Sequence, residues 1–254
     1  MLWNALGAIK ILFGNKKRED CMTKFTYALI DFFTIIVPFL FSFHPKLKFY
    51  KTWKAFLPAV LITGTVFILW DIYFTYLGVW GFNEQYISGI TIGNLPLEEV
   101  LFFFCIPYSC VFTFHCLDLF IKSTFSSRLE NSITFLMIIL LLIFALFNMD
   151  KIYPMVTFIG LSLLLFIAGF LLKVTWLSRF YIIYCILLIP FLIVNGLLTG
   201  TGLDEPVVWY NSTEIFGIRI LTIPVEDVFY GMALILMNLL IYKYLKTKST
   251  TAFI

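Results

Sequence analysis

The chain has 254 residues, of which 61% are hydrophobic and 13% are charged, and its formal net charge is +3. A soluble globular domain has about 45–50% apolar and about 25% charged residues, and its polar residues could not cover so much apolar surface. The composition therefore excludes a cytosolic enzyme, a nucleic-acid-binding protein and a disordered chain. It indicates an integral membrane protein, in which the small net charge matters only through the positions of the cations.

Seven apolar stretches approach the ~20 residues that a helix needs to cross the ~30 Å core of a bilayer. In chain order they are residues 25–43, 55–75, 96–117, 133–147, 155–174, 181–198 and 224–244. The fourth stretch is the shortest, although Leu129 could extend it. Because the seven spans use most of the chain, we expect an all-α membrane protein of about seven transmembrane helices without a soluble domain.

An internal repeat relates the segments that lead into the third and seventh spans. Residues 89–100 align without gaps on residues 217–228, which lie 128 positions later, and six of the twelve positions are identical. The two spans are four apart, an even number, so the copies have parallel orientation in the membrane. We therefore expect two related halves, residues 23–128 and 149–246, joined by a connector helix in residues 129–148.

The two ends of the chain lie outside this repeat. Residues 2–13 either form a short helix in the membrane interface, or translation begins at Met22 and the preceding residues are not part of the protein. Residues 247–254 are expected to form a short C-terminal tail.

The lysines and arginines that follow this N-terminal tail are strongly biased to one side of the expected membrane. Beyond the start of the first span, only Lys151 and Arg219 lie on the other side. Cations concentrate in cytoplasmic loops, so this bias places the loops before the third and seventh spans on the non-cytoplasmic side. The cytoplasmic set is Lys46, Lys48, Lys51, Lys54, Lys122, Arg128, Lys173, Arg179, Lys243, Lys246 and Lys248.

Each half carries a Pro-x-Glu-Glu/Asp motif at the outer start of a helix, with Glu98 and Glu99 in the first copy and Glu226 and Asp227 in the second. Acids are common in the first turn of any helix, where free amide groups and the helix dipole favour them. Carboxyl groups in a membrane are costly, however, and indicate function. Because neighbouring residues on a helix point ~100° apart, one acid of each pair can face a cavity. We expect the four acids to form one functional region, and the longer side chain shared by both copies favours Glu98 and Glu226.

Two further acids and a set of aromatic residues are candidates for the same site. Asp71 follows Trp70 at the end of an apolar run, where its carboxyl group would be partly desolvated, and Asp31 lies deep in the first span. Aromatic residues near the outer boundary are expected of any interfacial belt, but beside paired acids their ring faces can also stabilise a cation. The aromatic candidates for substrate binding are Trp70, Trp80, Phe102, Phe103, Tyr108, Trp209, Tyr210, Phe229 and Tyr230.

Taken together, these motifs resemble those of the small integral-membrane lycopene cyclases, which some bacteria make as two subunits and other organisms carry as two fused halves. The resemblance covers roughly residues 25–244. The matching positions are Trp70-Asp71 and residues 78–83, 89–90 and 95–103 in the first half, and residues 195–200, 207–211 and 217–227 in the second.

The resemblance implies a multi-pass membrane enzyme that closes the ψ-ends of lycopene into β-rings by acid/base catalysis, giving γ-carotene and β-carotene. The expected partners are lycopene or a related acyclic carotenoid and membrane lipid. The reaction is redox-neutral and the chain has no Gly-x-Gly-x-x-Gly segment after a strand, so no flavin or nicotinamide cofactor is expected. Two alternatives stay open: a different end-group enzyme, such as a hydratase that traps the same cation with water, and a proton-coupled transporter.

Overall fold

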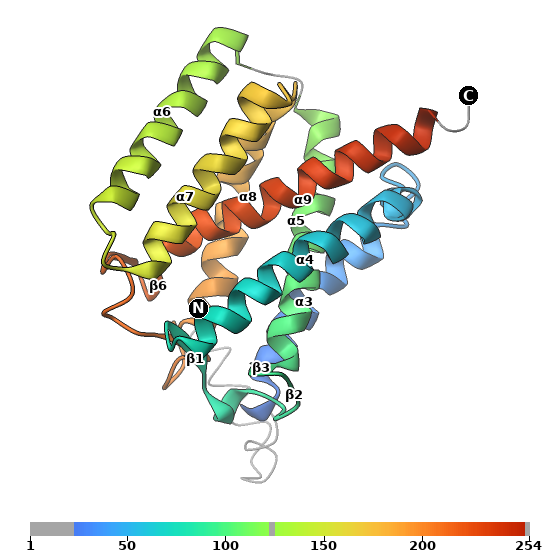
Figure 1. Cartoon of the computed structure of the whole chain (residues 1–254). Coiled ribbons are helices and arrows are strands. Elements are labelled where there is room, and N and C mark those ends of the chain that lie inside the picture. Colours follow the sequence, from blue (N-terminus) through green and yellow to red (C-terminus); the bar gives the residue numbers. More distant parts are fainter. Residues whose placement is uncertain (1–22, 122–124, 252–254) are drawn as a thin grey trace.

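The computed structural model describes residues 23–121 and 125–251, so the expected arrangements of residues 1–22 and of the last three residues lie outside it. Most of the described residues belong to seven α-helices (Figure 1). The helices are α3 (Thr26–Phe41), α4 (Trp53–Tyr76), α5 (Leu97–Phe120), α6 (Ser127–Leu146), α7 (Ile152–Phe166), α8 (Leu177–Leu198) and α9 (Val225–Thr251). Each helix coincides with one expected span, which confirms the all-α membrane fold.

Six helical segments of the described chain are long and apolar enough to cross a membrane. The exception is α3, whose 16 residues span only about 24 Å at 1.5 Å per residue. The shortest expected span is a full helix of 20 residues, because Ser126 caps it by accepting the backbone N–H of Leu129. A 3-10 turn, η1 (Phe49–Thr52), leads into α4, and a π-helical turn, η3 (Ile167–Leu171), extends α7.

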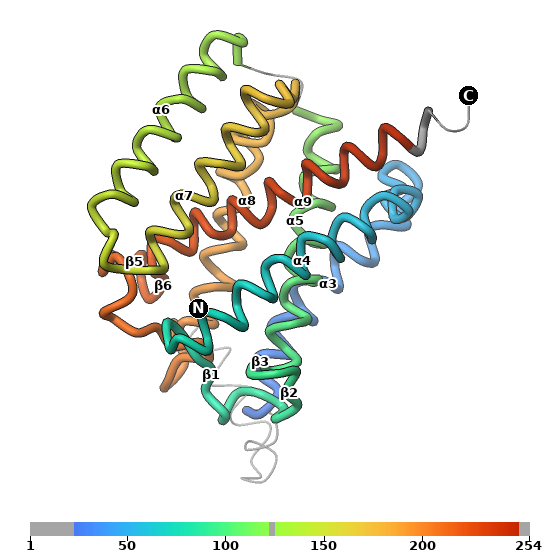
Figure 2. Tube along the Cα trace, viewed as in Figure 1, coloured from blue at the N-terminus to red at the C-terminus, as the bar shows by residue number. Residues whose placement is uncertain are grey.

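Short strands pair at one end of the helix bundle, in the loops that join α4 to α5 and α8 to α9 (Figures 1 and 2). A 3-10 turn, η2 (Glu84–Tyr86), lies in the first of these loops. All the strand pairs in the described residues are antiparallel. They are β1 (Trp80–Phe82) with β4 (Val208–Tyr210), β2 (Thr91–Ile92) with β3 (Leu95–Pro96), and β5 (Arg219–Ile220) with β6 (Ile223–Pro224).

The pairing of β1 with β4 joins equivalent loops of the two halves about a local two-fold axis. Gly81 lies opposite Trp209, its own counterpart 128 residues later. The flanking hydrogen bonds repeat with the same offset, because Asn83 N donates to Val207 O at 2.9 Å and Asn211 N donates to Val79 O at 2.8 Å. Glycine is required at the axis because a Cβ on Gly81 would collide with the Trp209 ring.

The two β-hairpins that precede α5 and α9 are built alike. Gly89 and Gly217 begin them with φ values of 87° and 91°, a left-handed conformation that favours glycine. Each hairpin then returns to a proline, Pro96 or Pro224, immediately before the helix begins. The repeated sequence therefore encodes a repeated turn that delivers two helix starts to the same end of the bundle.

Helix packing encloses α9 and leaves other helix faces apolar and exposed. Helix α9 lies beside α4 and α7, and α3 lies beside α5 (Figure 2). On α9 the side chains of Leu236 and Leu239 are fully buried, whereas Phe33 on α3 and Phe135 on α6 are more than half exposed. Exposed apolar faces of this kind suit helices that contact lipid.

Candidate active site

The four motif acids occupy the first turns of α5 and α9 and are buried there. The exposed fraction of the residue is 2% for Glu98, 8% for Glu99, 0% for Glu226 and 3% for Asp227. A hairpin ending in proline sets each helix start, and proline suits this place because the first amide groups of a helix have no partner within it. The helix starts of the two halves are thus brought to the same end of the protein.

The first acid of each pair faces the loop that precedes its own helix. Glu98 Oε1 accepts the backbone N–H of Ser88 at 2.7 Å, and Glu226 Oε1 accepts the backbone N–H of Phe216. These equivalent hydrogen bonds tie each loop to the start of its helix. Neither acid borders the cavity described below.

The second acid of each pair faces the interior and accepts tyrosine hydroxyl groups. Tyr27 donates to Glu99 Oε2 at 2.6 Å, and Tyr153 donates to Asp227 Oδ1 at 2.6 Å. Asp227 has a second donor, because Tyr210 donates to its Oδ2 at 3.0 Å. Each half therefore contains its own carboxyl–phenol pair, and the second half has one additional phenol.

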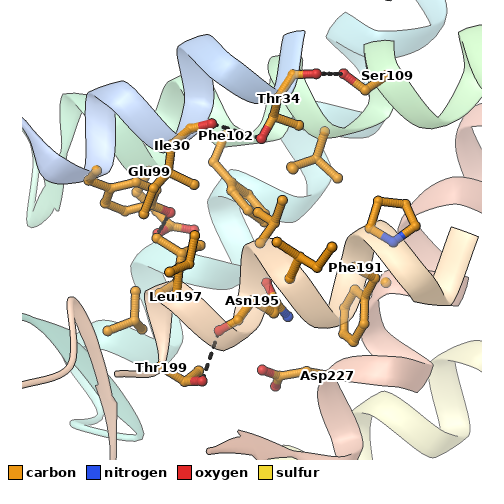
Figure 3. A pocket seen from close by; sticks show the side chains of 18 of the residues that line it. Ile30, Thr34, Glu99, Phe102, Ser109, Phe191, Asn195, Leu197, Thr199 and Asp227 are labelled. Atoms are coloured by element: carbon orange, nitrogen blue, oxygen red, sulfur yellow. Dashed lines mark hydrogen bonds between the residues drawn. The ribbon is translucent and has the colours of Figure 1, made fainter. Parts of the chain in front are cut away.

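Both of these interior acids border one cavity of about 760 Å³, which lies among α3, α5, α8 and α9 (Figure 3). Its lining is mostly apolar, and the acids lie at the end where the strands pair. Residues that border it include Tyr27, Ile30, Thr34, Asp71, Trp80, Glu99, Phe102, Tyr184, Phe191, Asn195, Asp227 and Tyr230. A mostly dry cavity with a few convergent polar groups is the usual form of a site for a small apolar ligand.

Aromatic rings surround the acid end of the cavity. The ring centroids of Trp80 and Tyr153 are 5.0 Å apart, and those of Trp80 and Tyr210 are 6.0 Å apart. Tyr230 lies 6.3 Å from Tyr153 and 6.5 Å from Trp80. Ring faces at these distances from a shared cavity can stabilise a positive charge, because the face of a π-system carries negative potential.

Asp71 borders the same cavity and is held by Trp80, whose indole Nε1–H donates to Asp71 Oδ1. Its exposed fraction is 1%, and Oδ2 has no partner among the described residues. Asp31 is 3% exposed and neither of its oxygens has a partner there, but Asp31 does not line the cavity. The first half therefore contributes two buried carboxyl groups, Asp31 and Asp71, in addition to its two motif acids.

Tyr210 lies in β4, outside the membrane-spanning helices, and its hydroxyl is the second donor to Asp227. Burial and the neighbouring Asp227 carboxyl raise the pKa of the Tyr210 phenol well above its ordinary value. The phenol therefore stays protonated and remains a hydrogen-bond donor through the neutral and mildly alkaline range.

The nine aromatic candidates separate into two groups. Trp80, Phe102, Tyr210 and Tyr230 border the cavity, whereas the other five do not. Among these, Tyr108 lies nine residues after Glu99 on α5, about 14 Å along the helix, and shares a 2.6 Å hydrogen bond with Ser42. The rest pack behind the cavity wall or lie at the surface: Trp70 stacks on Phe67, Phe103 contacts Phe67, Phe229 contacts Phe158, and Trp209 is 44% exposed.

Sequence reasoning did not find Tyr27 or Tyr153, although both bind the interior acids. The available signal was spacing, since the two tyrosines are 126 residues apart and each opens the first helix of its half. It also missed Tyr184 and Asn195, which border the cavity from α8. Asn195 is three residues from the end of α8 and Asp71 is five residues from the end of α4, and both border the cavity.

Fold and site together define a class: a multi-pass membrane protein in which two related sets of helices place a pair of carboxyl groups in one apolar cavity. A family model described as lycopene cyclase matches residues 24–117 and 150–245, which together make up most of the chain. The chain belongs to the lycopene cyclase family. It is therefore an enzyme of carotenoid cyclisation with a carotenoid substrate. No curated protein and no solved structure matches the chain.

Proposed function

We propose that the protein is a lycopene β-cyclase, an isomerase that closes the ψ-ends of lycopene into β-rings and gives γ-carotene and β-carotene. The observation that carries this proposal is the pair Glu99 and Asp227, two buried carboxyl groups from different halves that border one apolar cavity. Lycopene dissolves in the bilayer, so a site among membrane-spanning helices can receive it.

The chemistry needs one proton donor and one proton acceptor and leaves atoms and electrons balanced. An acid protonates the terminal C1=C2 bond at C2, which leaves a cation at C1. The C5=C6 bond attacks this cation, so that the C1–C6 bond forms and the positive charge moves to C5. A base then removes the proton from C6 and leaves the C5=C6 bond of a β-ring. One proton enters and one leaves, so no redox step occurs.

We assign Glu99 as the proton donor and Asp227 as the base. Hydrogen bonds from phenols stabilise a carboxylate, and Asp227 receives two of them, from Tyr153 and Tyr210. Glu99 receives one, from Tyr27, and lies within electrostatic range of the Asp227 carboxyl. The asymmetry of the two halves thus favours a carboxylate at Asp227 and a protonated acid at Glu99.

The aromatic wall would stabilise the cation between the two proton transfers. Trp80, Tyr153, Tyr210 and Tyr230 surround the acid end, and a cation over such rings in a desolvated site gains about 2 kcal/mol. The same rings exclude water, which would otherwise trap the cation as an alcohol. This feature favours a cyclase over a hydratase.

We also propose that the acid end lies on the non-cytoplasmic side of the cell membrane. The loop between α3 and α4 carries Lys46, Lys48 and Lys51 at the end opposite the strands (Figure 1), and cations of this kind mark the cytoplasmic side. An impermeant thiol reagent applied to intact cells should label Glu84→Cys in the strand loops and not Lys46→Cys. Labelling of Lys46→Cys alone would reverse the orientation.

The activity can be tested by expression in a bacterium that accumulates lycopene, followed by pigment chromatography with mass detection. A cyclase gives new carotenoids with the mass of lycopene and absorption at shorter wavelength. A product heavier by one water would identify a hydratase instead. Unchanged lycopene, with the protein folded in the membrane, would contradict the proposal.

A further inference from the structure

The cavity opens on the apolar surface of the bundle, between α3 and α8. Leu29 and Phe33 on α3 line it and are 37% and 67% exposed. Ile193 and Leu197 on α8 also line it and are 61% and 38% exposed. Figure 3 shows side chains of these two helices projecting into the same space. Because α3 and α8 are apolar helices of a membrane protein, this opening faces lipid.

The equivalent place in the other set of helices, between α7 and α4, is filled. There the indole of Trp70 lies against Gly160, where an added Cβ would be 3.9 Å from the ring, and its centroid is 5.2 Å from that of Tyr230. The offset of 126 that relates Tyr153 to Tyr27 also relates Gly160 to Thr34. Between α4 and α8 an offset of 124 aligns the buried Phe56 with the buried Phe180 and the buried Ala59 with the buried Ile183, and it relates Trp70 to Val194. Thr34 and Val194 both border the cavity. The smaller valine leaves open on one side the space that tryptophan occupies on the other.

The cavity is also too short for a whole carotenoid. On α5 its lining residues follow one face from Glu99 to Thr113, a rise of about 21 Å over fourteen residues. The substrate is a long rigid polyene that cannot fold back on itself, because rotation about its conjugated bonds is hindered. With one end beside the acids, the rest of the polyene must leave through the opening between α3 and α8.

We propose that the carotenoid enters sideways from the bilayer between α3 and α8, and that the cavity receives one ψ-end at each visit. The singly cyclised carotenoid then returns to the bilayer before its second end can react, because the molecule cannot reverse inside the cavity. This inference rests on the proposed cyclase function. It further implies that the enzyme recognises only the end that it cyclises, so the structure of the far end does not affect the reaction.

The opening can be closed by placing tryptophan on either of its sides. Val194→Trp on α8 copies the residue that fills the other half, and Thr34→Trp approaches from α3, so one variant tests the inference if the other fails to fold. The matched control is Ile189→Trp, because Ile189 is 65% exposed on α8 and does not line the cavity.

Each tryptophan change is made in two backgrounds. In the Glu99→Gln background, lycopene that co-purifies with the protein reports binding without turnover, and in the otherwise unchanged chain, pigment analysis reports cyclisation. We expect Val194→Trp and Thr34→Trp each to lose both by about tenfold or more, because the added indole occupies the space through which the polyene must pass, while the control resembles its parent. The inference would be overturned if Val194→Trp and Thr34→Trp both fold and retain lycopene and activity, or if the control loses as much as they do.

Single-end recognition has its own test, in which the substrate is an acyclic carotenoid whose other end carries a sugar. We expect its free end to be cyclised at a rate close to that of lycopene. Failure to cyclise it, while lycopene is cyclised, would show that both ends are recognised. If the protein cyclises neither, the proposed function fails. The binding measurements on the tryptophan variants still test whether the carotenoid enters between α3 and α8.

Release between the two reactions is tested by a chase. Vesicles containing the enzyme and labelled lycopene are fused with vesicles containing a large excess of unlabelled lycopene. We expect the labelled singly cyclised carotenoid to stay singly cyclised after the chase, because it has left the enzyme. Conversion of the label to the doubly cyclised product without dilution would contradict release.

Discussion

Glu99 and Asp227 lie 128 residues apart in the sequence, yet each accepts a tyrosine hydroxyl at 2.6 Å and both border one cavity. The relationship follows from the repeat, because equivalent hairpins deliver α5 and α9 to the same end of the bundle. A donor and an acceptor of protons can thus meet one substrate end in a space that excludes water. Substitutions that keep the shape of a side chain and remove one functional group separate the chemical roles of these residues from their structural roles.

Glu99→Gln should nearly abolish ring formation. Glutamine keeps the shape of the side chain and can still accept the Tyr27 hydroxyl, but it has no acidic proton. Loss of a general acid lowers a rate by about 10²–10⁴-fold, so a lycopene-accumulating strain should stay red. The measurement is the ratio of cyclic to acyclic carotenoid at equal amounts of folded protein in the membrane.

Glu98→Gln is the matched control on the neighbouring residue. Glu98 accepts a backbone N–H from Ser88 and does not border the cavity, and glutamine can replace it as an acceptor. The loss of activity should stay within about tenfold, the effect of roughly one neutral hydrogen bond. If Glu98→Gln is inactive and Glu99→Gln is active, the ranking favoured by the sequence is right and the one proposed from the cavity is wrong.

Tyr210→Phe should slow cyclisation by about ten- to a hundredfold, the worth of one hydrogen bond to a charged group. The ring is retained, and phenylalanine already occupies the equivalent position in the first half at Phe82, so folding should not change. Co-purified lycopene should stay constant while the turnover rate falls, since the lost hydrogen bond acts on Asp227 and not on the polyene. An equal fall in binding and turnover would instead indicate a packing role.

Trp80→Phe should lower both thermal stability and activity, because it removes the hydrogen bond to the buried Asp71. A buried group left without its partner costs about 1–3 kcal/mol. Adding Asp71→Asn to this variant replaces the unpartnered carboxyl group with an amide, which cannot ionise, and should recover part of the stability. A double-mutant cycle of melting temperatures measures this coupling, and additive effects of the two changes would refute it.

The helices and the common end of the acidic motifs could be predicted from the sequence, because both depend on local patterns. Apolar runs specify the spans, and Gly89 and Gly217 recur where each hairpin needs a positive φ. The choice between Glu98 and Glu99 could not be predicted. It depends on how α5 is rotated about its axis, which is set by packing against α3 and α4 and not by the motif itself.

For the aromatic candidates, too, the sequence motif does not determine which side chains reach the cavity. Trp80 and Tyr210 were identifiable because β1 and β4 flank the acidic helices in the repeat. Tyr108 belongs to the same aromatic-rich run as Phe102, but nine residues of helix carry it away from Glu99, towards Ser42. A single tyrosine in an apolar helix forms no motif, so only the 126-residue spacing to Tyr153 could have indicated Tyr27. Its role emerges only when α3 packs against α5.

Leu221→Gly should stabilise the protein. Leu221 has a φ of 58° in the turn between β5 and β6, where the first half has Gly93 with a φ of 66°. A residue with a Cβ loses about 1–2 kcal/mol in this left-handed region, whereas glycine adopts it freely but loses more chain entropy on folding, about 0.5–1 kcal/mol. Leu221 is 73% exposed, so little apolar burial is lost. The net gain should be about 0.5 kcal/mol, seen as a small rise in melting temperature with unchanged cyclisation.

Gly93→Leu is the reverse change in the other half and should lower the melting temperature. A fall with Leu221→Gly would mean that the leucine side chain stabilises the hairpin by more than its backbone strain costs.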